Sequence, residues 1–230
     1  MKITFHGHAA VEIVHQGLHF WIDPFLTGNP ASTVQVEDQK ADVILLTHGH
    51  NDHVGDTIAL AQKYDALVIA PYELAIYLEG KDVARTHGMG IGGPYDFPFG
   101  RVMYTNAIHG SSFVDPETNQ MVYTGQPGGI LLTLGDRTIY HAGDTSLFSD
   151  MKLIGIGQKI DLALLPIGGN FTMGPQEALL AAEWIGADQY VPIHYNTFPP
   201  IKQDGEKFVR DLQEKGLTGV VLEPYESIHL

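Results

Sequence analysis

The chain has 230 residues, of which 13 are lysine or arginine and 27 are aspartate or glutamate, so its formal net charge at pH 7 is −14. With 44% hydrophobic and 17% charged residues, its composition is that of a soluble globular protein and not of a disordered or membrane-embedded one. It contains no cysteine, which excludes disulfides, thiolate zinc sites, iron–sulfur clusters and a cysteine nucleophile. Any metal must therefore be held by nitrogen and oxygen atoms.

The predicted elements of the first half alternate between strands and helices. Apolar runs rich in β-branched residues predict strands at residues 11–14, 18–22, 42–46 and 66–70, the first two joined as a hairpin. Helical spacing of apolar residues predicts helices at residues 52–63 and 71–78. The glycine- and proline-rich residues 87–98 are predicted to form a loop.

The second half repeats this interleaving. Strands are predicted at residues 102–108, 121–124, 130–134, 138–140, 162–166, 189–193 and 220–223. Helices are predicted at residues 175–185 and 205–215, and Leu147, Phe148 and Met151 are spaced like a helix face that packs in the core. Because strands and helices alternate throughout, we expect helices to cover the sheet faces of one α/β domain over residues 1–230.

Charge and the start of the chain bear on partners and location. An acidic chain without clustered lysine and arginine is not expected to bind nucleic acid, since such binding depends on releasing counterions from phosphates. The first residues lack the apolar core of a signal peptide, and the longest uncharged stretch is interrupted by glycine, proline and glutamine. We expect a cytoplasmic protein with a small-molecule substrate and no membrane partner; a homo-oligomer is compatible with the sequence.

The segment that follows the strand at residues 42–46 carries the chemistry. It reads Thr-His48-Gly-His50-Asn-Asp52-His53, which places four potential metal ligands within six residues. His48 and His50 can converge only from an extended segment, because residues two apart diverge on a helix. Burying these groups beside a hydrophobic strand is costly unless something satisfies them. Imidazole and carboxylate donors suit zinc, manganese, iron or nickel.

This motif resembles the signature of the metallo-β-lactamase superfamily, and further parts of that family's pattern follow in order. His109 ends a predicted strand, Asp144 lies in His-Ala-Gly-Asp-Thr, and His194 ends the strand at residues 189–193. These segments follow the carboxyl ends of strands, where open α/β sheets commonly place their sites. The resemblance implies one metal held by His48, His50 and His109, a second held by Asp52, His53 and His194, and Asp144 as the bridge between them.

A closer resemblance is to the small bacterial single-domain metal-dependent hydrolases, which are distant kin of ascorbate-phosphate lactonases. Gly-His-Ala, Ile-Asp-Pro-Phe, Tyr-His-Ala-Gly-Asp-Thr, Asn-Phe-Thr-Met-Gly-Pro and His-Tyr-Asn-Thr-Phe-Pro-Pro carry it. It implies a four-layer αββα sandwich. Asp23 is interpreted as accepting the second N–H of a ligand histidine. His8 and His141 are either similar supporting residues or histidines that bond only to backbone.

The chemistry expected of this site is hydrolysis. Two divalent ions, with zinc as the first choice, would share a water and lower its pKa toward about 7, which makes a bridging hydroxide the expected nucleophile. Asp52 is also a candidate for proton relay. Ester, lactone and phosphodiester substrates suit this chemistry, whereas lactamases of this fold often use a cysteine ligand that this chain lacks.

Several alternatives stand beside this interpretation. His87 is the main rival of His109 as third ligand, but it lies in a glycine-rich segment and not at a strand end. Residues 88–93 fit G-x-G-x-x-G without a strand before them or a helix after them, so a dinucleotide site is not expected. Asn170, Phe171 and Thr172 lie either at the substrate mouth or in a plain turn, with Met173. The rival functions are a diiron redox protein, which needs an electron donor, and a non-catalytic metal-binding protein.

Overall fold

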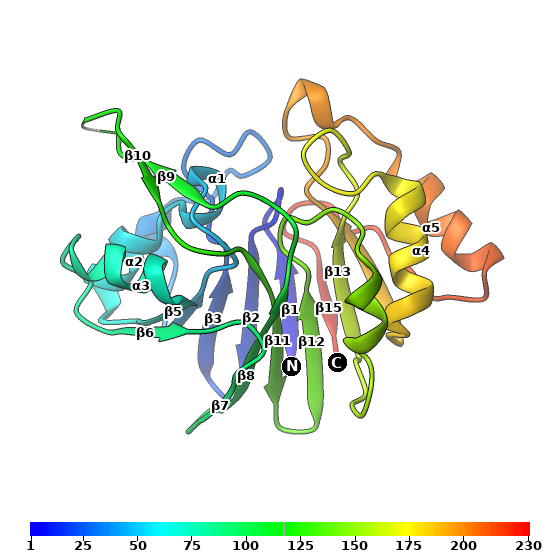
Figure 1. Cartoon of the computed structure of the whole chain (residues 1–230), viewed down its shortest axis with the longest axis horizontal. Coiled ribbons are helices and arrows are strands. Elements are labelled where there is room, and N and C mark those ends of the chain that lie inside the picture. Colours follow the sequence, from blue (N-terminus) through cyan, green and yellow to red (C-terminus); the bar gives the residue numbers. More distant parts are fainter. Residues whose placement is uncertain (117) are drawn as a thin grey trace.

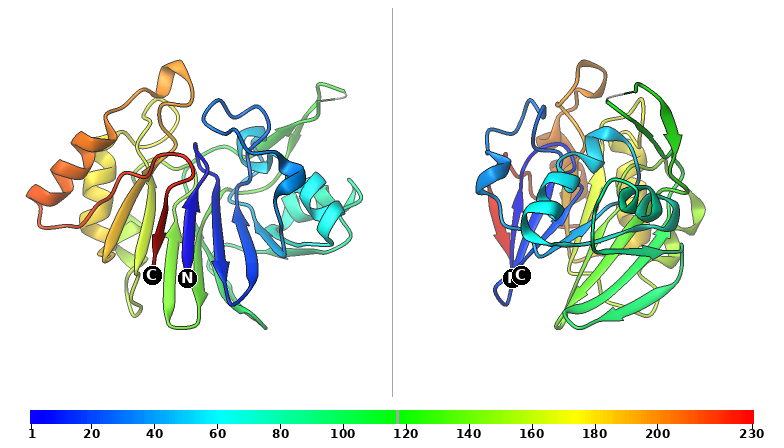
Figure 2. Two further views of the ribbon diagram at one scale, coloured as in Figure 1. Left: turned by 180° about the vertical axis from the view of Figure 1, so that it is seen from behind. Right: turned by 90° about the vertical axis from the view of Figure 1, so that its left-hand side faces the viewer.

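The computed structural model describes residues 1–116 and 118–230, and its centre is a pair of facing β-sheets (Figure 1). The first sheet has the order β15-β1-β2-β3-β4-β5-β6. Its strands are β1 (Lys2–Phe5), β2 (Val11–His15), β3 (Leu18–Ile22), β4 (Val43–Leu45), β5 (Leu67–Pro71), β6 (Thr86–Met89) and β15 (Ser227–His229). Strands β3 to β6 run parallel, whereas β15, β1, β2 and β3 are antiparallel neighbours. The pairing of β15 with β1 brings the two termini together (Figure 2).

The second sheet has the order β14-β13-β12-β11-β8-β7. Its strands are β7 (Pro94–Phe97), β8 (Gly100–Asn106), β11 (Gly128–Leu134), β12 (Arg137–His141), β13 (Leu162–Pro166) and β14 (Gln189–Ile193). Strands β12, β13 and β14 are parallel. Their carboxyl ends meet at the same end of the molecule as the loop after β4, at the top of Figure 1.

Three apolar clusters hold the layers together. The largest lies between the sheets and includes Phe20 and Leu45 from the first and Ile130 and Leu164 from the second. The outer face of the first sheet packs on α2 (Thr57–Tyr64) and α3 (Tyr72–Glu79), and that of the second on α4 (Pro175–Ile185) and α5 (Gly205–Glu214). Figure 2 shows this helix–sheet–sheet–helix order. The predicted four-layer αββα sandwich is confirmed.

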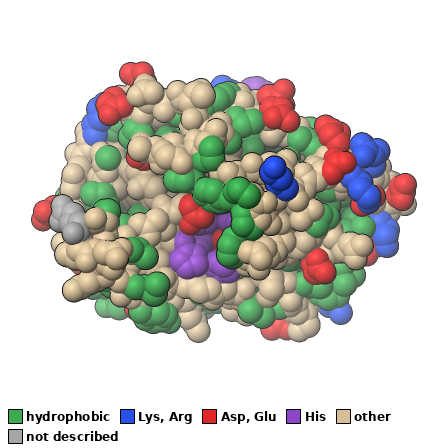
Figure 3. Space-filling model, turned by 90° about the horizontal axis from the view of Figure 1, so that it is seen from above, with side chains coloured by type: hydrophobic (Ala, Val, Ile, Leu, Met, Phe, Trp, Pro, Cys, Tyr) green, Lys and Arg blue, Asp and Glu red, His purple; other side chains and the backbone are tan. Residues whose placement is uncertain are grey.

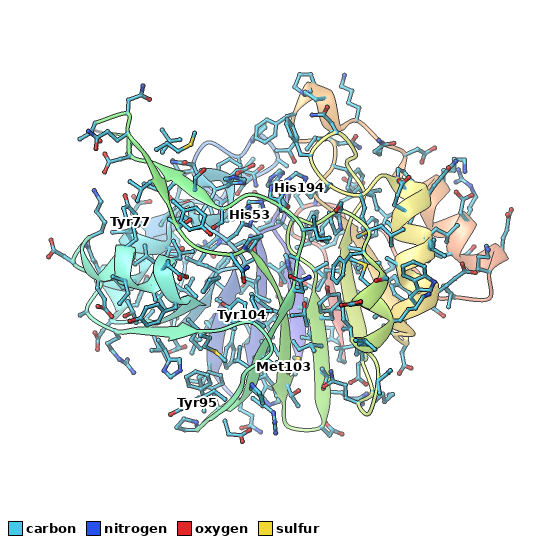
Figure 4. The ribbon with its side chains drawn as sticks, viewed as in Figure 1. His53, Tyr77, Tyr95, Met103, Tyr104 and His194 are labelled. Carbon is cyan, nitrogen blue, oxygen red and sulfur yellow. The ribbon has the colours of Figure 1, made fainter. Side chains whose placement is uncertain are left out.

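One buried tyrosine joins the sheets directly below the predicted site. Tyr104 of β8 is fully buried, and its hydroxyl lies 2.8 Å from the Leu46 carbonyl and 3.0 Å from the Ile69 carbonyl (Figure 4). Leu46 is the residue between β4 and the His-rich motif. The contact therefore fixes the start of that motif against the second sheet, because buried polar groups are stable only when paired.

The glycine-rich segment at residues 87–98 corrects one prediction. It was expected as a loop, but β6 pairs in parallel with β5 and β7 pairs antiparallel with β8. Both are outermost in their sheets, where glycine and proline are tolerated because one edge needs no partner. Pairing with a neighbouring strand outweighed the local turn signal.

Two further predictions differ from the structure. The single helix expected at residues 52–63 is divided into α1 (Asn51–Val54) and α2, because Gly55 has a φ of 45° and a Cβ there would lie 2.4 Å from the Pro24 carbonyl oxygen. The strand predicted at residues 220–223 is absent: one isolated bridge joins Gly219 to Tyr190, and the chain then turns toward β15. Strands β1, β15 and β9 (Ser112–Val114) were not predicted.

The remaining elements are short. Strands β9 and β10 (Met121–Tyr123) form a separate two-stranded sheet, which we call the arm and which extends from the body beside α1 (Figure 1). Met151 lies in the 3₁₀ turn η2 (Ser149–Leu153) and is fully buried, so the core position predicted for it is confirmed. The other short turns are η1 (Val36–Asp38) and η3 (Pro199–Ile201). Among the described residues, no helix combines the length and apolarity needed to cross a membrane.

Candidate metal centre

All seven side chains predicted as ligands converge at one end of the two sheets. They come from the loop after β4 and the helix α1 that follows it, from the segment after β8, from the turn after β12 and from the residue after β14. His53 of α1 and His194, which follows β14, approach each other at the top of the strands, with ring centroids 5.6 Å apart (Figure 4). The parallel strands of both sheets end here, and this geometry brings together residues as distant in sequence as His48 and His194.

A first cluster consists of His48, His50, His109 and Asp144, whose candidate donor atoms lie within 4.8 Å of one another. His48 Nε2 is 2.9 Å from His50 Nδ1, and His109 Nε2 is 3.2 Å from the same nitrogen. Three ring nitrogens thus point at one spot. The extended backbone before α1 produces this convergence, since His50 has a β conformation.

A second cluster consists of His8, Asp52, His53 and His194, again with donor atoms within 4.8 Å. Asp144 lies between the two clusters. Its Oδ2 is 3.4 Å from His109 Nε2 and 3.0 Å from His194 Nε2, while its Oδ1 is 3.3 Å from His53 Nε2. One carboxylate therefore faces histidines of both clusters.

Asp23 orients two of the histidines from behind. Its carboxylate accepts hydrogen bonds from the Thr47 amide at 2.8 Å and the Thr47 hydroxyl at 2.6 Å, and it lies 2.7 Å from His53 Nδ1. Because the Thr47 proton goes to Asp23, Thr47 Oγ1 accepts from His48 Nδ1 at 2.9 Å. We therefore assign the protons of His48 and His53 to Nδ1, which leaves both Nε2 lone pairs facing the clusters.

His8 supports Asp52 in the second cluster. Its Nε2 is 3.2 Å from Asp52 Oδ2, and its Nδ1 is 3.0 Å from Thr197 Oγ1. Burial, together with the neighbouring His194, lowers the pKa of His8 to about 4, so the ring is neutral at pH 7. A neutral ring that donates to Asp52 accepts from Thr197. Thr47 and Thr197 were missed by the sequence analysis, although each lies within three residues of a predicted ligand.

His141 and His87 contact other groups. His141 Nε2 lies 3.0 Å from the Ala9 carbonyl, and its Nδ1 accepts from the Gly143 amide at 3.1 Å. It thereby joins the turn that carries Asp144 to the loop that carries His8. Both of its hydrogen bonds are to backbone groups, which was the second of the two roles considered for it. His87 lies in β6 and packs its ring 4.5 Å from that of Tyr95, outside both clusters.

Burial and charge show that the clusters fit a cation. Burial lowers the pKa of His48 and His50, which keeps both rings in the neutral form that binds metals. Burial alone raises the pKa of Asp144, but His194 and His53 hold it well below its usual value. Burial also opposes a charged His53, yet Asp144 and Asp23 raise its pKa well above the usual value. The space between His53 and Asp144 therefore demands positive charge, from a proton or a metal ion.

Unpaired buried atoms lead to the same conclusion. His53 Nε2, Asp144 Oδ1 and both ring nitrogens of His194 are buried without a hydrogen-bond partner. Such atoms are costly unless they are paired, and they lie together at the meeting point of the clusters. Nitrogen donors from the five histidines predicted as ligands and oxygen donors from two carboxylates fit divalent ions such as zinc.

Comparison with known proteins agrees with this geometry. The family described as the beta-lactamase superfamily domain matches residues 19–195. Relatives named UPF0173 metal-dependent hydrolase are 57% identical in Bacillus cereus and 58% identical in Shouchella clausii, in each case over 100% of both chains. The chain belongs to the β-lactamase superfamily. A solved structure of Igni18, a metallo hydrolase from Ignicoccus hospitalis, is 34% identical, with a TM-score of 0.87 over 99% of this chain and 97% of that chain. The protein is thus a metal-dependent hydrolase.

The arm of this hydrolase is fastened to the metal-binding motif. Asn51 donates to the Val114 carbonyl at 2.8 Å and accepts from the Val114 amide at 2.9 Å. The Gly49 amide donates to Ser111 Oγ at 3.1 Å, and a Cβ at Gly49 would lie 2.0 Å from Thr124 Oγ1. Both residues stand between predicted ligands. The sequence offers no local signal for these contacts, because the partners are about 60 or more residues away.

The clusters open into a pocket of about 220 Å³. Its lining consists of predicted ligands and two aromatic side chains, namely His50, Asp52, His109, Asp144, His194, Phe171 and Phe198. Seen from above, the exposed histidines and an acidic group lie directly beside hydrophobic side chains (Figure 3). Of the two alternatives considered for residues 170–173, Phe171 fits a place at the pocket mouth. Met173 is instead buried in the core.

Proposed function

We propose that this hydrolase binds two divalent ions, zinc by preference, and breaks an ester-type bond of a small molecule. His48, His50 and His109 would hold one ion and Asp52, His53 and His194 the other, with Asp144 shared. The position of Asp144 carries the proposal, because its two oxygens face histidines of both clusters within 3.4 Å. In this arrangement, bound divalent ions would supply hydroxide at neutral pH and polarisation of a carbonyl or phosphoryl oxygen.

The chain's own residues prepare this chemistry. Asp23 and Thr47 fix the proton positions of His48 and His53, so that Nε2 of each ring is free to bind. The hydrogen bond from His8 and the nearby His53 keep Asp52 ionised, although burial alone raises its pKa. Asp52 is about one-third exposed, which lets it exchange a proton with a bound substrate or water.

Turnover by metal-loaded protein tests the proposal. Zinc-loaded wild type is expected to hydrolyse at least one of a panel of p-nitrophenyl esters, lactones and phosphodiesters. Asp144→Asn should lose at least 100-fold in kcat/KM while keeping its circular dichroism spectrum. The matched control is Asp161→Asn, which changes a buried carboxylate of the same type that lies next to β12, away from both clusters.

The rival functions give different results. A diiron redox protein would consume oxygen in the presence of a reductant and leave the hydrolytic panel untouched. A non-catalytic metal-binding protein would bind ions without turnover of either kind. Equal activity of Asp144→Asn and wild type would refute the assigned site.

A further inference from the structure

The pocket over the clusters has an aromatic wall, and its lining contains no lysine or arginine. Of its seven lining residues, the charged ones are Asp52 and Asp144, both of which are predicted ligands. The other five are the predicted ligands His50, His109 and His194 and the two rings of Phe171 and Phe198. Anionic substrates are generally held by arginine or lysine, whose side chains match carboxylate and phosphate groups. This lining instead suits an uncharged, apolar group.

A second pocket adjoins the first at His109, which lines both. Its volume is about 290 Å³, and its lining contains no aspartate, glutamate, lysine or arginine. Ile108 is 51% exposed and Tyr123 of the arm is 71% exposed, and both line this second pocket. The pocket over the clusters is thus mainly aromatic, whereas the second pocket is uncharged and mixes apolar side chains with Asn106, Ser111 and Gln126.

The aromatic residue at the rim sits on a braced loop. Phe171 is 54% exposed, yet its neighbours are tied down, since Met173 is buried and its amide donates to the Thr145 carbonyl at 2.9 Å. Asn170 adopts a left-handed φ of 54°, which turns the chain so that Phe171 faces outward. Exposing an aromatic ring to water is unfavourable and does not help the chain to fold, so an exposed ring beside a pocket indicates a binding surface. The loop that presents Phe171 is bonded to the turn that carries Asp144.

Phe198 is held in the same way on the other side of the second cluster. Its ring centroid lies 5.4 Å from that of His8, and the preceding Thr197 hydroxyl is bonded to His8 Nδ1. The Ile201 amide donates to the Phe198 carbonyl at 3.1 Å at the start of η3. Both rings are thus positioned by residues next to predicted ligands.

From this lining we propose that the substrate is an uncharged carboxylic ester or lactone with an apolar acyl group, which packs against Phe171 and Phe198. This rests on the proposed hydrolase function. The metal ions would meet the scissile carbonyl, while the rings bury the acyl chain. For a phosphodiester, the metal ions would be the only positive charges, because neither pocket lining contains a lysine or arginine to bind its phosphate.

An acyl-length series tests the proposal. Zinc-loaded protein is assayed on p-nitrophenyl acetate, butyrate and hexanoate and on bis(p-nitrophenyl) phosphate. We expect kcat/KM to rise about twofold per methylene, or roughly 15-fold from acetate to hexanoate, which corresponds to half-burial of each methylene. Phe171→Ser should reduce this rise to less than about fivefold, because one of the two rings that bury the acyl chain is removed. The matched control is Tyr95→Ser, because Tyr95 is 48% exposed and lies in β7, outside both pockets.

Binding separates failure of this inference from failure of the proposed function. Hexanamide, a neutral acyl compound that resists hydrolysis, is titrated into metal-free protein beside diethyl phosphate. Hexanamide should shift the backbone amide NMR signals of Phe171 and of the residues next to it in the chain, and diethyl phosphate should not. Preference for the phosphodiester, equal rates on acetate and hexanoate, or shifts with diethyl phosphate alone would overturn the inference. Hexanamide binding without turnover of any panel member would support the acyl-binding role of the two rings and contradict the proposed ester hydrolysis.

Discussion

Replacing Asp23 by asparagine is expected to weaken metal binding without a direct contact to the metal. Asp23 is fully buried and receives three hydrogen bonds, two from Thr47 and one from His53. Asparagine has the same shape and tolerates the left-handed φ of 48° found at this position. Its amide group, however, donates where the carboxylate accepts. His53 would then carry its proton on Nε2, where a metal must bind.

The size of this effect follows from the hydrogen bonds lost. Removing a partner of this kind from a ligand histidine typically costs 10- to 100-fold in metal affinity, or about 1.4 to 2.8 kcal/mol. One buried donor left unpaired also lowers the free energy of unfolding by about 1–3 kcal/mol. Asp23→Asn should therefore lose both zinc affinity and stability, whereas Asp161→Asn should lose stability alone, since Asp161 bonds to Arg137 and Lys159 and not to a cluster residue.

Competition with a chromophoric chelator measures the zinc affinity, and urea unfolding of the metal-free proteins measures stability. The reasoning is refuted if Asp23→Asn binds zinc within twofold of wild type. It is also refuted if Asp161→Asn loses as much zinc affinity as Asp23→Asn, because the effect would then reflect general destabilisation.

Three further predictions concern supporting residues. Thr47→Val removes the hydroxyl that fixes His48 and should lower zinc affinity about tenfold in the same competition assay, whereas Thr138→Val, remote from both clusters, should leave it unchanged. Asn51→Ala removes the hydrogen bond from the Val114 amide. Loss of a bond of about 1 kcal/mol should accelerate the hydrogen exchange of this amide about fivefold, as measured by NMR, and an unchanged rate would contradict the fastening of the arm. Burial raises the pKa of Asp161, but bonds from the Thr138 amide and two basic side chains lower it below its usual value. The ionised carboxylate therefore contributes fully to stability above pH 4, and this contribution is lost as the pH falls through the lowered folded-state pKa. In urea unfolding, the difference in the free energy of unfolding between wild type and Asp161→Asn should shrink below pH 4. A difference that stays constant would disprove this.

The convergence of the predicted ligands could be predicted because the motif at His48 to His53 is marked locally and the family resemblance adds His109, Asp144 and His194. His48 and His50 follow an apolar strand at a spacing that only extended backbone can bring together, and Asp144 and His194 each follow a recognisable strand. Parallel strands that end at the same edge of a sheet then collect these residues. The helix at residues 175–185 was equally clear, with its proline at the first position and Ala178 to Ile185 on one buried face.

Contacts between distant segments could not be predicted in this way. Thr47 is an ordinary residue in the sequence, and its role depends on Asp23, which belongs to the neighbouring strand. Asn51 meets Val114 only because the arm folds back over α1. The edge strands β6 and β7 likewise depend on partners, β5 and β8, that supply the pairing their own glycine and proline residues discourage.

The central claim is that this hydrolase holds two ions with Asp144 shared between them. The most direct test is the metal-to-chain ratio of zinc-reconstituted protein after gel filtration, measured by elemental mass spectrometry for wild type, Asp144→Ala and Asp161→Asn. The account predicts a ratio near two for wild type and Asp161→Asn and a ratio of one or below for Asp144→Ala. A wild-type ratio of one or below, or a ratio that Asp144→Ala leaves at two, would contradict it.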